Sequence, residues 1–125
     1  MDVKKVLYVE DNITKYMDVA NYLKRVGVKE IEWVSNAEKA VAAIESASEP
    51  FDLFLFDMHF NYYGQDDHSA GEKLMNLLRE KGIDTPIAFC SSQNWKIPGS
   101  IGNIFYHPNR YWEEEVDAIL NKIKK

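Results

Sequence analysis

Apolar residues gather in short blocks, and the segments between these blocks place apolar residues at helical spacing. The blocks are short and mostly apolar, which is typical of strands buried on both faces: 3–9, 51–58, 86–91 and 104–106. Residues 30–34 alternate instead, as a half-exposed strand does. Apolar residues recur every three or four positions in the segments that we expect to be helices: 13–26, 37–44, 69–81 and 111–123.

Strands that alternate with helices favour a parallel sheet covered by helices on both sides. The chain has 125 residues and shows no internal repeat or linker, so we expect one domain over 1–125. The segment 92–103 stands where a further helix would complete the alternation. Pro98, Gly99 and Gly102 oppose a stable helix there.

The segment from His59 to His68 is polar and aromatic without a clear period, which predicts a loop. Ser69, with Glu72 three positions later, matches a capping box at the start of the next helix. The loop aromatics have two interpretations. They form a patch for a partner, or they pack onto the third helix and order the loop; the residues concerned are Phe60, Tyr62 and Tyr63.

Polar side chains follow four of the predicted strands, and the carboxyl ends of parallel strands meet at one edge of a sheet. Glu10 and Asp11 follow the first strand, Asp57 the third, Ser91 the fourth, and His107 the fifth. Three carboxylates gathered without a cation repel one another, and Mg²⁺ relieves this because it prefers oxygen ligands. A metal-bound Asp57 could attack phosphorus, and Ser91 could donate to a phosphoryl oxygen. The alternative is a set of ordinary surface acids that close strands.

Composition excludes several classes of protein. The net charge is −5 and the only basic run is 122–125, which argues against nucleic acid or an anionic membrane as the main partner. No apolar stretch approaches the roughly 20 residues that span a bilayer, and the first residues do not read as a signal peptide. The single cysteine, Cys90, reads as a small buried strand residue rather than a nucleophile and suits a reducing cytosol, so we expect a cytoplasmic protein.

Four motifs together resemble the receiver domain of two-component response regulators, the CheY-like family. They are VLYVEDN, FDLFLFDM, PIAFCSS and the strand that ends at His107-Pro108, and the resemblance runs from about Lys4 to Lys124. It implies a flavodoxin-like, doubly wound, five-stranded parallel sheet in the order 2-1-3-4-5. It also implies a phosphoprotein that works in a two-component phosphorelay.

The resemblance assigns a role to each residue at the strand ends. Asp57 matches the aspartate that a sensor histidine kinase phosphorylates, and Glu10 and Asp11 match the acidic pair that holds Mg²⁺. The backbone carbonyl of His59 matches a further protein contact to the metal. Ser91 matches the switch hydroxyl that follows the phosphoryl group.

The sequence departs from the family pattern in four places. His107 stands where the family has a lysine ahead of proline, and Ile104 stands where an aromatic switch residue is usual, with Tyr106 two positions on. The loop after Asp57 is longer than usual. The segment between Ser91 and His107 is shorter than usual, so we expect the fourth helix to be truncated or absent.

Three functional hypotheses follow. The first is a stand-alone receiver without an output domain, phosphorylated by a sensor histidine kinase or a phosphotransfer protein. Such a receiver signals to an unknown downstream protein, and a homodimer is one form that it could take. The second is a pseudo-receiver, an interaction module with little or no phosphorylation, which His107 supports. The third is a phosphatase with an aspartyl nucleophile, which needs a second acid two positions after Asp57, where the chain has His59.

Overall fold

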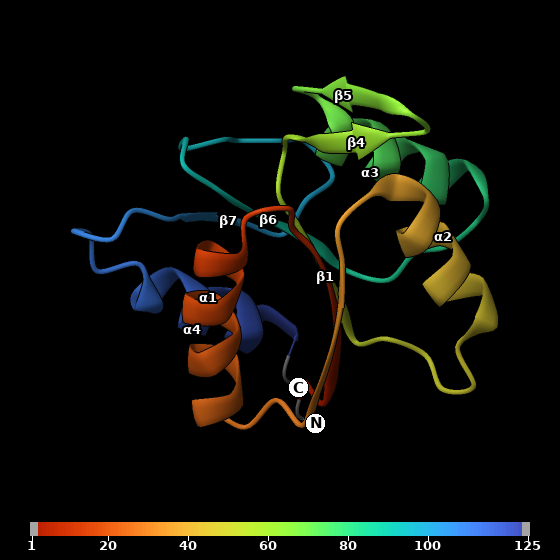
Figure 1. The fold of residues 1–125 in the computed structure, drawn as a ribbon. Helices are drawn as coiled ribbons and strands as arrows, with labels where there is room; N and C mark the ends of the chain where they lie inside the picture. Colours follow the sequence, from red (N-terminus) through yellow and green to blue (C-terminus); the bar gives the residue numbers. More distant parts are fainter. Residues whose placement is uncertain (1–2, 124–125) are drawn as a thin grey trace.

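A computed structural model of the protein describes residues 3–123. The elements are four helices and seven strands, shown in Figure 1: β1 (Lys5–Val9), α1 (Ile13–Arg25), β2 (Glu30–Val34), α2 (Ala37–Ser46), β3 (Leu53–Phe56), β4 (Phe60–Tyr62), β5 (Gln65–Asp67), α3 (Ala70–Glu80), β6 (Ile87–Ser91), β7 (Asn103–Phe105) and α4 (Glu113–Ile123). The expected single domain over 1–125 remains a prediction, since residues 1–2 and 124–125 lie outside the described part.

The main sheet has five parallel strands in the order β2-β1-β3-β6-β7. Counted among these five strands alone, this is the order 2-1-3-4-5, so the predicted fold class is confirmed. Helices α1 and α4 cover one face of the sheet, and α2 and α3 cover the other (Figure 1). The carboxyl ends of all five strands therefore lie along one edge.

Strand β3 is the centre of both hydrophobic layers. Leu53 and Leu55 belong to the layer beneath α1 and α4, whereas Phe54 and Phe56 belong to the layer beneath α2 and α3. All four side chains are buried, because the strand has neighbours on both sides and helices on both faces. This explains the uninterrupted apolar run and fixes the position of Asp57 directly after it.

Helices α1 and α2 begin at the predicted positions, and an asparagine caps each of them. Asn12 Oδ1 accepts a hydrogen bond from the Lys15 N–H at 3.1 Å, and Asn36 Oδ1 accepts one from the Lys39 N–H at 2.9 Å. The capping box at Ser69 is wrong, since the Ser69 side chain makes no capping hydrogen bond. The Ser69 N–H instead donates to Asp67 Oδ1 at 2.7 Å, so the preceding strand orders the start of α3.

The loop predicted after Asp57 is wrong in part, because β4 and β5 form an antiparallel hairpin. Phe60 is fully buried and Tyr62 is half-buried against the layer beneath α2 and α3, which favours the packing interpretation for these two aromatics. Tyr63 is 51% exposed at the turn. The Tyr63 N–H donates to Glu38 Oε1 at 2.8 Å, which ties the hairpin to α2.

The segment between β6 and β7 contains no helix, as its shortened length and its proline and glycines predicted. Trp95 and Ile97 pack against the layer beneath α2 and α3, and Ile101 packs against the layer beneath α1 and α4. The segment therefore wraps across the sheet edge as an ordered connection. Within residues 3–123, no helix has the length and the apolar character needed to cross a membrane.

Candidate functional site

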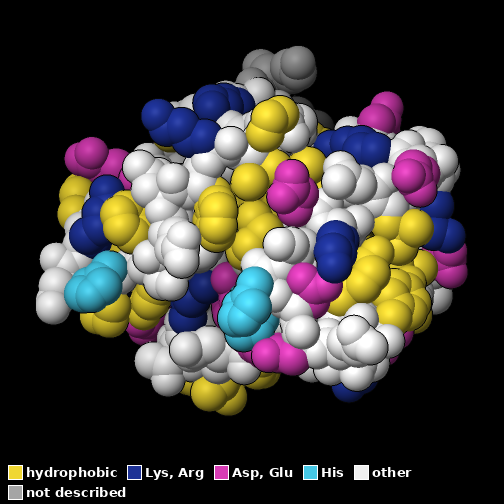
Figure 2. Space-filling model, turned by 90° about the horizontal axis from the view of Figure 1, so that it is seen from above, with side chains coloured by type: hydrophobic (Ala, Val, Ile, Leu, Met, Phe, Trp, Pro, Cys, Tyr) yellow, Lys and Arg dark blue, Asp and Glu magenta, His cyan; other side chains and the backbone are white. Residues whose placement is uncertain are grey.

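Backbone hydrogen bonds align the carboxyl ends of the strands. The Glu10 N–H donates to Val34 O at 3.0 Å, and the Asp57 N–H donates to Val9 O at 2.9 Å. These bonds extend the ladders one residue beyond the strands, so the acidic residues leave the sheet side by side. Above them lies an open cavity of about 710 Å³. Figure 2 looks down on this edge and shows acidic and histidine side chains sharing it.

The three predicted acids converge at the floor of this cavity. Carboxylate oxygens of Glu10, Asp11 and Asp57 lie within 4.8 Å of one another. Glu10 is fully buried and Asp57 is 9% exposed, whereas Asp11 faces solvent. Burial is the main cause that raises the pKa of Glu10 to about 8, and it also raises the pKa of Asp11, with the Asp57 charge adding to both shifts. Three converging carboxylates fit a hard divalent cation in ligand type and spacing.

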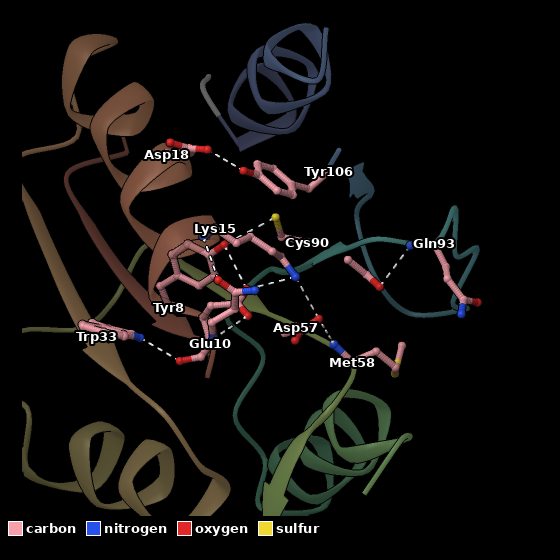
Figure 3. Close-up of polar contacts among 12 residues, drawn as sticks. Tyr8, Glu10, Lys15, Asp18, Trp33, Asp57, Met58, Cys90, Gln93 and Tyr106 are labelled. Atoms are coloured by element: carbon pink, nitrogen blue, oxygen red, sulfur yellow. Dashed lines mark hydrogen bonds and ion pairs between the residues drawn. The ribbon is translucent and has the colours of Figure 1, made fainter. Parts of the chain in front are cut away.

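A lysine that the sequence reasoning did not single out lies among these acids. The Lys15 Nζ lies 3.0 Å from Glu10 Oε1 and 3.0 Å from Asp57 Oδ1, and only 6% of the residue is exposed. Figure 3 shows its side chain reaching from α1 toward Asp57. Burial lowers the pKa of Lys15, but its neighbours Cys90, Glu10 and Asp57 more than offset this, so the pKa is raised and the ammonium remains charged.

A buried tyrosine supports this ion pair from below. The Tyr8 hydroxyl lies 3.3 Å from Glu10 Oε1 and 3.4 Å from Cys90 Sγ. Its burial, together with the neighbouring Cys90 and Glu10, raises the pKa of Tyr8 well above its ordinary value, so the hydroxyl keeps its proton and can donate to Glu10. On the other side, Trp33 Nε1 donates to the Glu10 carbonyl at 2.8 Å. Glu10 is thus held from two strands, its side chain by Tyr8 of β1 and its backbone by Trp33 of β2.

Ser91 closes the site from the end of β6. Its Oγ accepts hydrogen bonds from Trp95 Nε1 at 3.0 Å and from the Gln93 N–H at 3.3 Å. A hydroxyl has two acceptor sites and one donor, so the Ser91 proton remains available to a group that enters the cavity. Trp95 therefore contacts the site. It belongs to the segment between β6 and β7, which has no helix.

The three histidines line the cavity, and within residues 3–123 no hydrogen bond or ion pair joins them to its three converging acids. His107 is exposed, and its Nδ1 accepts a hydrogen bond from the Asn109 N–H at 3.1 Å. Within the described residues, no hydrogen bond or ion pair joins His107 to Asp57. The rings of His59 and His68 have centroids 4.2 Å apart, and His59 Nε2 lies 2.9 Å from Asp66 Oδ1. The predicted metal contact through the His59 carbonyl stays a prediction.

Tyr106 faces α1 rather than solvent. Its hydroxyl donates to the Asp18 carboxylate, and burial together with this bond raises the pKa of Tyr106 to about 12 (Figure 3). Ile104 is buried in the same hydrophobic layer. The bond joins the end of β7 to the helix that carries Lys15, so the two elements that border the site are held together.

Comparison with known proteins identifies the fold. The sequence matches no protein-family model and no curated protein sequence. In structure the chain is similar to the chemotaxis response regulator CheY4 of Vibrio cholerae, with a TM-score of 0.70 and 20% identity over 98% of this chain and 99% of that one. It is also similar to the response regulator TrrA of Thermotoga maritima in complex with Mg²⁺ and BeF, with a TM-score of 0.70 and 20% identity over 94% and 99%.

A third similar structure is the receiver domain of the sensor histidine kinase PA1611 of Pseudomonas aeruginosa, with magnesium coordinated in its active-site cleft. Its TM-score is 0.68 at 19% identity, over 96% of this chain and 97% of that one. Each likeness covers nearly the whole chain, and all three structures are response regulators or receiver domains. The chain therefore has the fold of a CheY-like receiver domain.

Proposed function

We propose that this chain is a receiver domain of two-component signalling that accepts a phosphoryl group on Asp57. The observation that carries the proposal is the placement of Asp57 at the end of the central strand, within 4.8 Å of two further carboxylates. The receiver fold around it supports the same conclusion. The donor would be a histidine kinase or a phosphotransfer protein, and the output would be a changed contact with another protein.

The hydrogen bonds of Asp57 distinguish its two oxygens. Oδ1 accepts from the Met58 N–H at 2.8 Å and from Lys15 Nζ at 3.0 Å. Among residues 3–123, no hydrogen-bond donor reaches Oδ2, so this oxygen is free to attack phosphorus. The new bond joins Oδ2 to phosphorus as the bond from phosphorus to the donor histidine nitrogen breaks, and that nitrogen keeps the electron pair and later takes a proton from water.

The residues around Asp57 prepare the site for the incoming charge. The free proton of Ser91 would hydrogen bond one phosphoryl oxygen. Glu10, Asp11 and the His59 carbonyl, together with Asp57, would hold Mg²⁺, which when bound neutralises the developing charge on the phosphoryl oxygens. Because Asp11 faces solvent and few protein ligands converge, we infer weak metal binding with several retained waters.

A pseudo-receiver is the second candidate, and two observations favour it. His107 lies exposed at the rim, where the family has a lysine, and the Lys15 ammonium already bridges Glu10 and Asp57. Because the Lys15 ammonium already offsets part of the negative charge of the acids, a divalent cation would be bound less strongly. Signalling by this alternative would depend on protein contact alone.

Incubation with acetyl phosphate and Mg²⁺ separates the candidates. We expect the intact protein to gain the mass of one phosphoryl group, which hydrolyses slowly after the donor is removed. A pseudo-receiver would gain no mass. A phosphatase would instead release inorganic phosphate continuously without accumulating the adduct. Either of these two results would contradict the proposed function.

A further inference from the structure

We propose that Lys15 is the cation that holds the phosphoryl group in this chain, in the role that the residue before Pro108 would otherwise have. The proposal rests on the proposed function, because it concerns the same site and names the residue that stabilises the phosphorylated form. It starts from the position of a buried ammonium. Nζ lies 3.0 Å from Asp57 Oδ1, the carboxylate that receives the group.

The donor count of the ammonium leaves room for a phosphoryl oxygen. A lysine ammonium has three N–H donors, and the structure assigns two of them to Glu10 Oε1 and Asp57 Oδ1. A phosphoryl group on the opposite Asp57 oxygen stays on the same carboxylate, so the third donor is close to the incoming oxygens. The ammonium is also largely removed from water, where a charge-assisted hydrogen bond is stronger than at an exposed position.

The packing of Lys15 keeps this cation in place. Its side chain emerges from α1 in line with Val19 and Leu23, which are buried in the hydrophobic layer below. The N-cap bond, in which the Lys15 N–H donates to Asn12 Oδ1, fixes the backbone of Lys15 itself. A lysine held by a helix on one side and by two carboxylates on the other has little freedom to leave, so it remains beside the acceptor.

The geometry at position 107 points the same way. The imidazole of His107 is exposed, and its Nδ1 is occupied by the Asn109 N–H. A neutral imidazole carries no fixed charge, whereas an ammonium is charged throughout the physiological range. The positive charge that a phosphoryl group on Asp57 needs is therefore supplied by Lys15 of α1.

Lys15 and a divalent cation can share the site, because, among residues 3–123, Lys15 leaves one of the three carboxylates, Asp11, without an ion pair. Lys15 contacts Glu10 Oε1 and Asp57 Oδ1. Within the described chain, no ion pair engages Asp11, whose side chain faces solvent. Asp11 thus stays available to a metal ion while Lys15 keeps its position.

A lysine exchange between positions 15 and 107 tests the proposal. The measurement is beryllofluoride binding at fixed Mg²⁺, followed by tryptophan fluorescence, since Trp95 contacts Ser91 in the site. We expect Lys15→Met to weaken binding by on the order of tenfold or more, as the loss of a charged hydrogen bond implies. The matched control Lys24→Met, at an exposed position of the same helix, should leave binding unchanged. The double variant Lys15→Met with His107→Lys should recover part of the lost affinity.

Two outcomes would overturn the proposal. The first leaves the proposed function intact, and the second overturns the proposed function as well. Wild-type affinity in Lys15→Met, together with weakened binding in His107→Ala, would return the role to position 107 and leave the proposed function intact. A wild-type chain that binds no beryllofluoride would overturn both the proposed function and the role of Lys15.

A measurement on the unaltered chain covers the case in which Lys15→Met does not fold, because that variant leaves Glu10 buried without its partner. Lysine acetylation by a water-soluble reagent is mapped by mass spectrometry, with the exposed Lys24 of the same helix as the matched control. We expect Lys15 to react far more slowly than Lys24, and to stay protected when Mg²⁺ and beryllofluoride are bound. Deprotection of Lys15 by the mimic would show that the ammonium is expelled and would overturn the proposal.

Discussion

Cys90 has a chemical environment that predicts an inert thiol. It is fully buried in β6, and burial raises the pKa of its thiol to about 12. Because the thiolate is the reactive form, the folded protein at pH 8 should react with a disulfide reagent orders of magnitude more slowly than the chain in guanidinium. The reaction should accelerate as the pH rises toward that pKa. Equal rates for the folded and the unfolded chain would contradict the burial of this residue.

The role of Lys15 shows what residue-level reading of the sequence can miss. Its charge suggests a solvated position, yet it is four positions before Val19 and eight before Leu23, and all three side chains are buried. Helical spacing alone therefore contained the signal. The charge concealed it, because a lysine is almost never buried unless it has a partner. Its partners are Glu10 and Asp57, and only the assembled sheet brings Asp57, 42 positions away, to Lys15.

Gly71 is the contact between α3 and the end of β3. A Cβ atom at this position would lie 2.3 Å from the Asp57 carbonyl oxygen and 2.9 Å from Phe89 Cε1. Neither a backbone oxygen nor a buried ring can move aside without disturbing the site. We therefore expect Gly71→Ala to reduce the free energy of unfolding by about 1–3 kcal/mol, measured in urea.

The matched control for Gly71→Ala is Asn76→Ala, at an exposed position of the same helix. It adds a good helix former without a clash, so it should be neutral or slightly stabilising. A Gly71→Ala variant as stable as this control would contradict the close approach of α3 to the strand. It would then follow that α3 sits farther from Asp57 than the structure shows.

The elements were predictable to different degrees. The five strands of the main sheet and the helices that cover it follow from their periods. The absence of a helix between β6 and β7 follows from Pro98, Gly99 and Gly102. The hairpin did not follow, because its turn is Tyr63-Gly64, with φ of 50° and 92°. A two-residue turn with two positive φ values is normally marked by Asn-Gly or Asp-Gly. A tyrosine in the first position gives no such signal.

At the scale of the molecule, the strand order produces the site. Asp57 and the acids after β1 leave adjacent strands, so their convergence was predictable from sequence and is observed. The surroundings of Asp57 were not predictable in the same way. They depend on how α1 and the 92–102 segment pack against the edge, and helical spacing shows that Lys15 faces inward but not which groups it meets there. The predicted role of His107 stays a prediction, since its exposed position neither requires nor forbids movement toward the phosphoryl group.

Peptide mapping by mass spectrometry after treatment with acetyl phosphate and Mg²⁺ tests directly whether Asp57 is the acceptor. We predict one phosphoryl group, located on Asp57 and labile to hydroxylamine, as an acyl phosphate should be. Asp57→Asn should abolish it, whereas the matched control Asp84→Asn, at an exposed acid before β6, should retain it. A phosphoryl group that persists in Asp57→Asn, or one found on Ser91 or a histidine, would contradict the account.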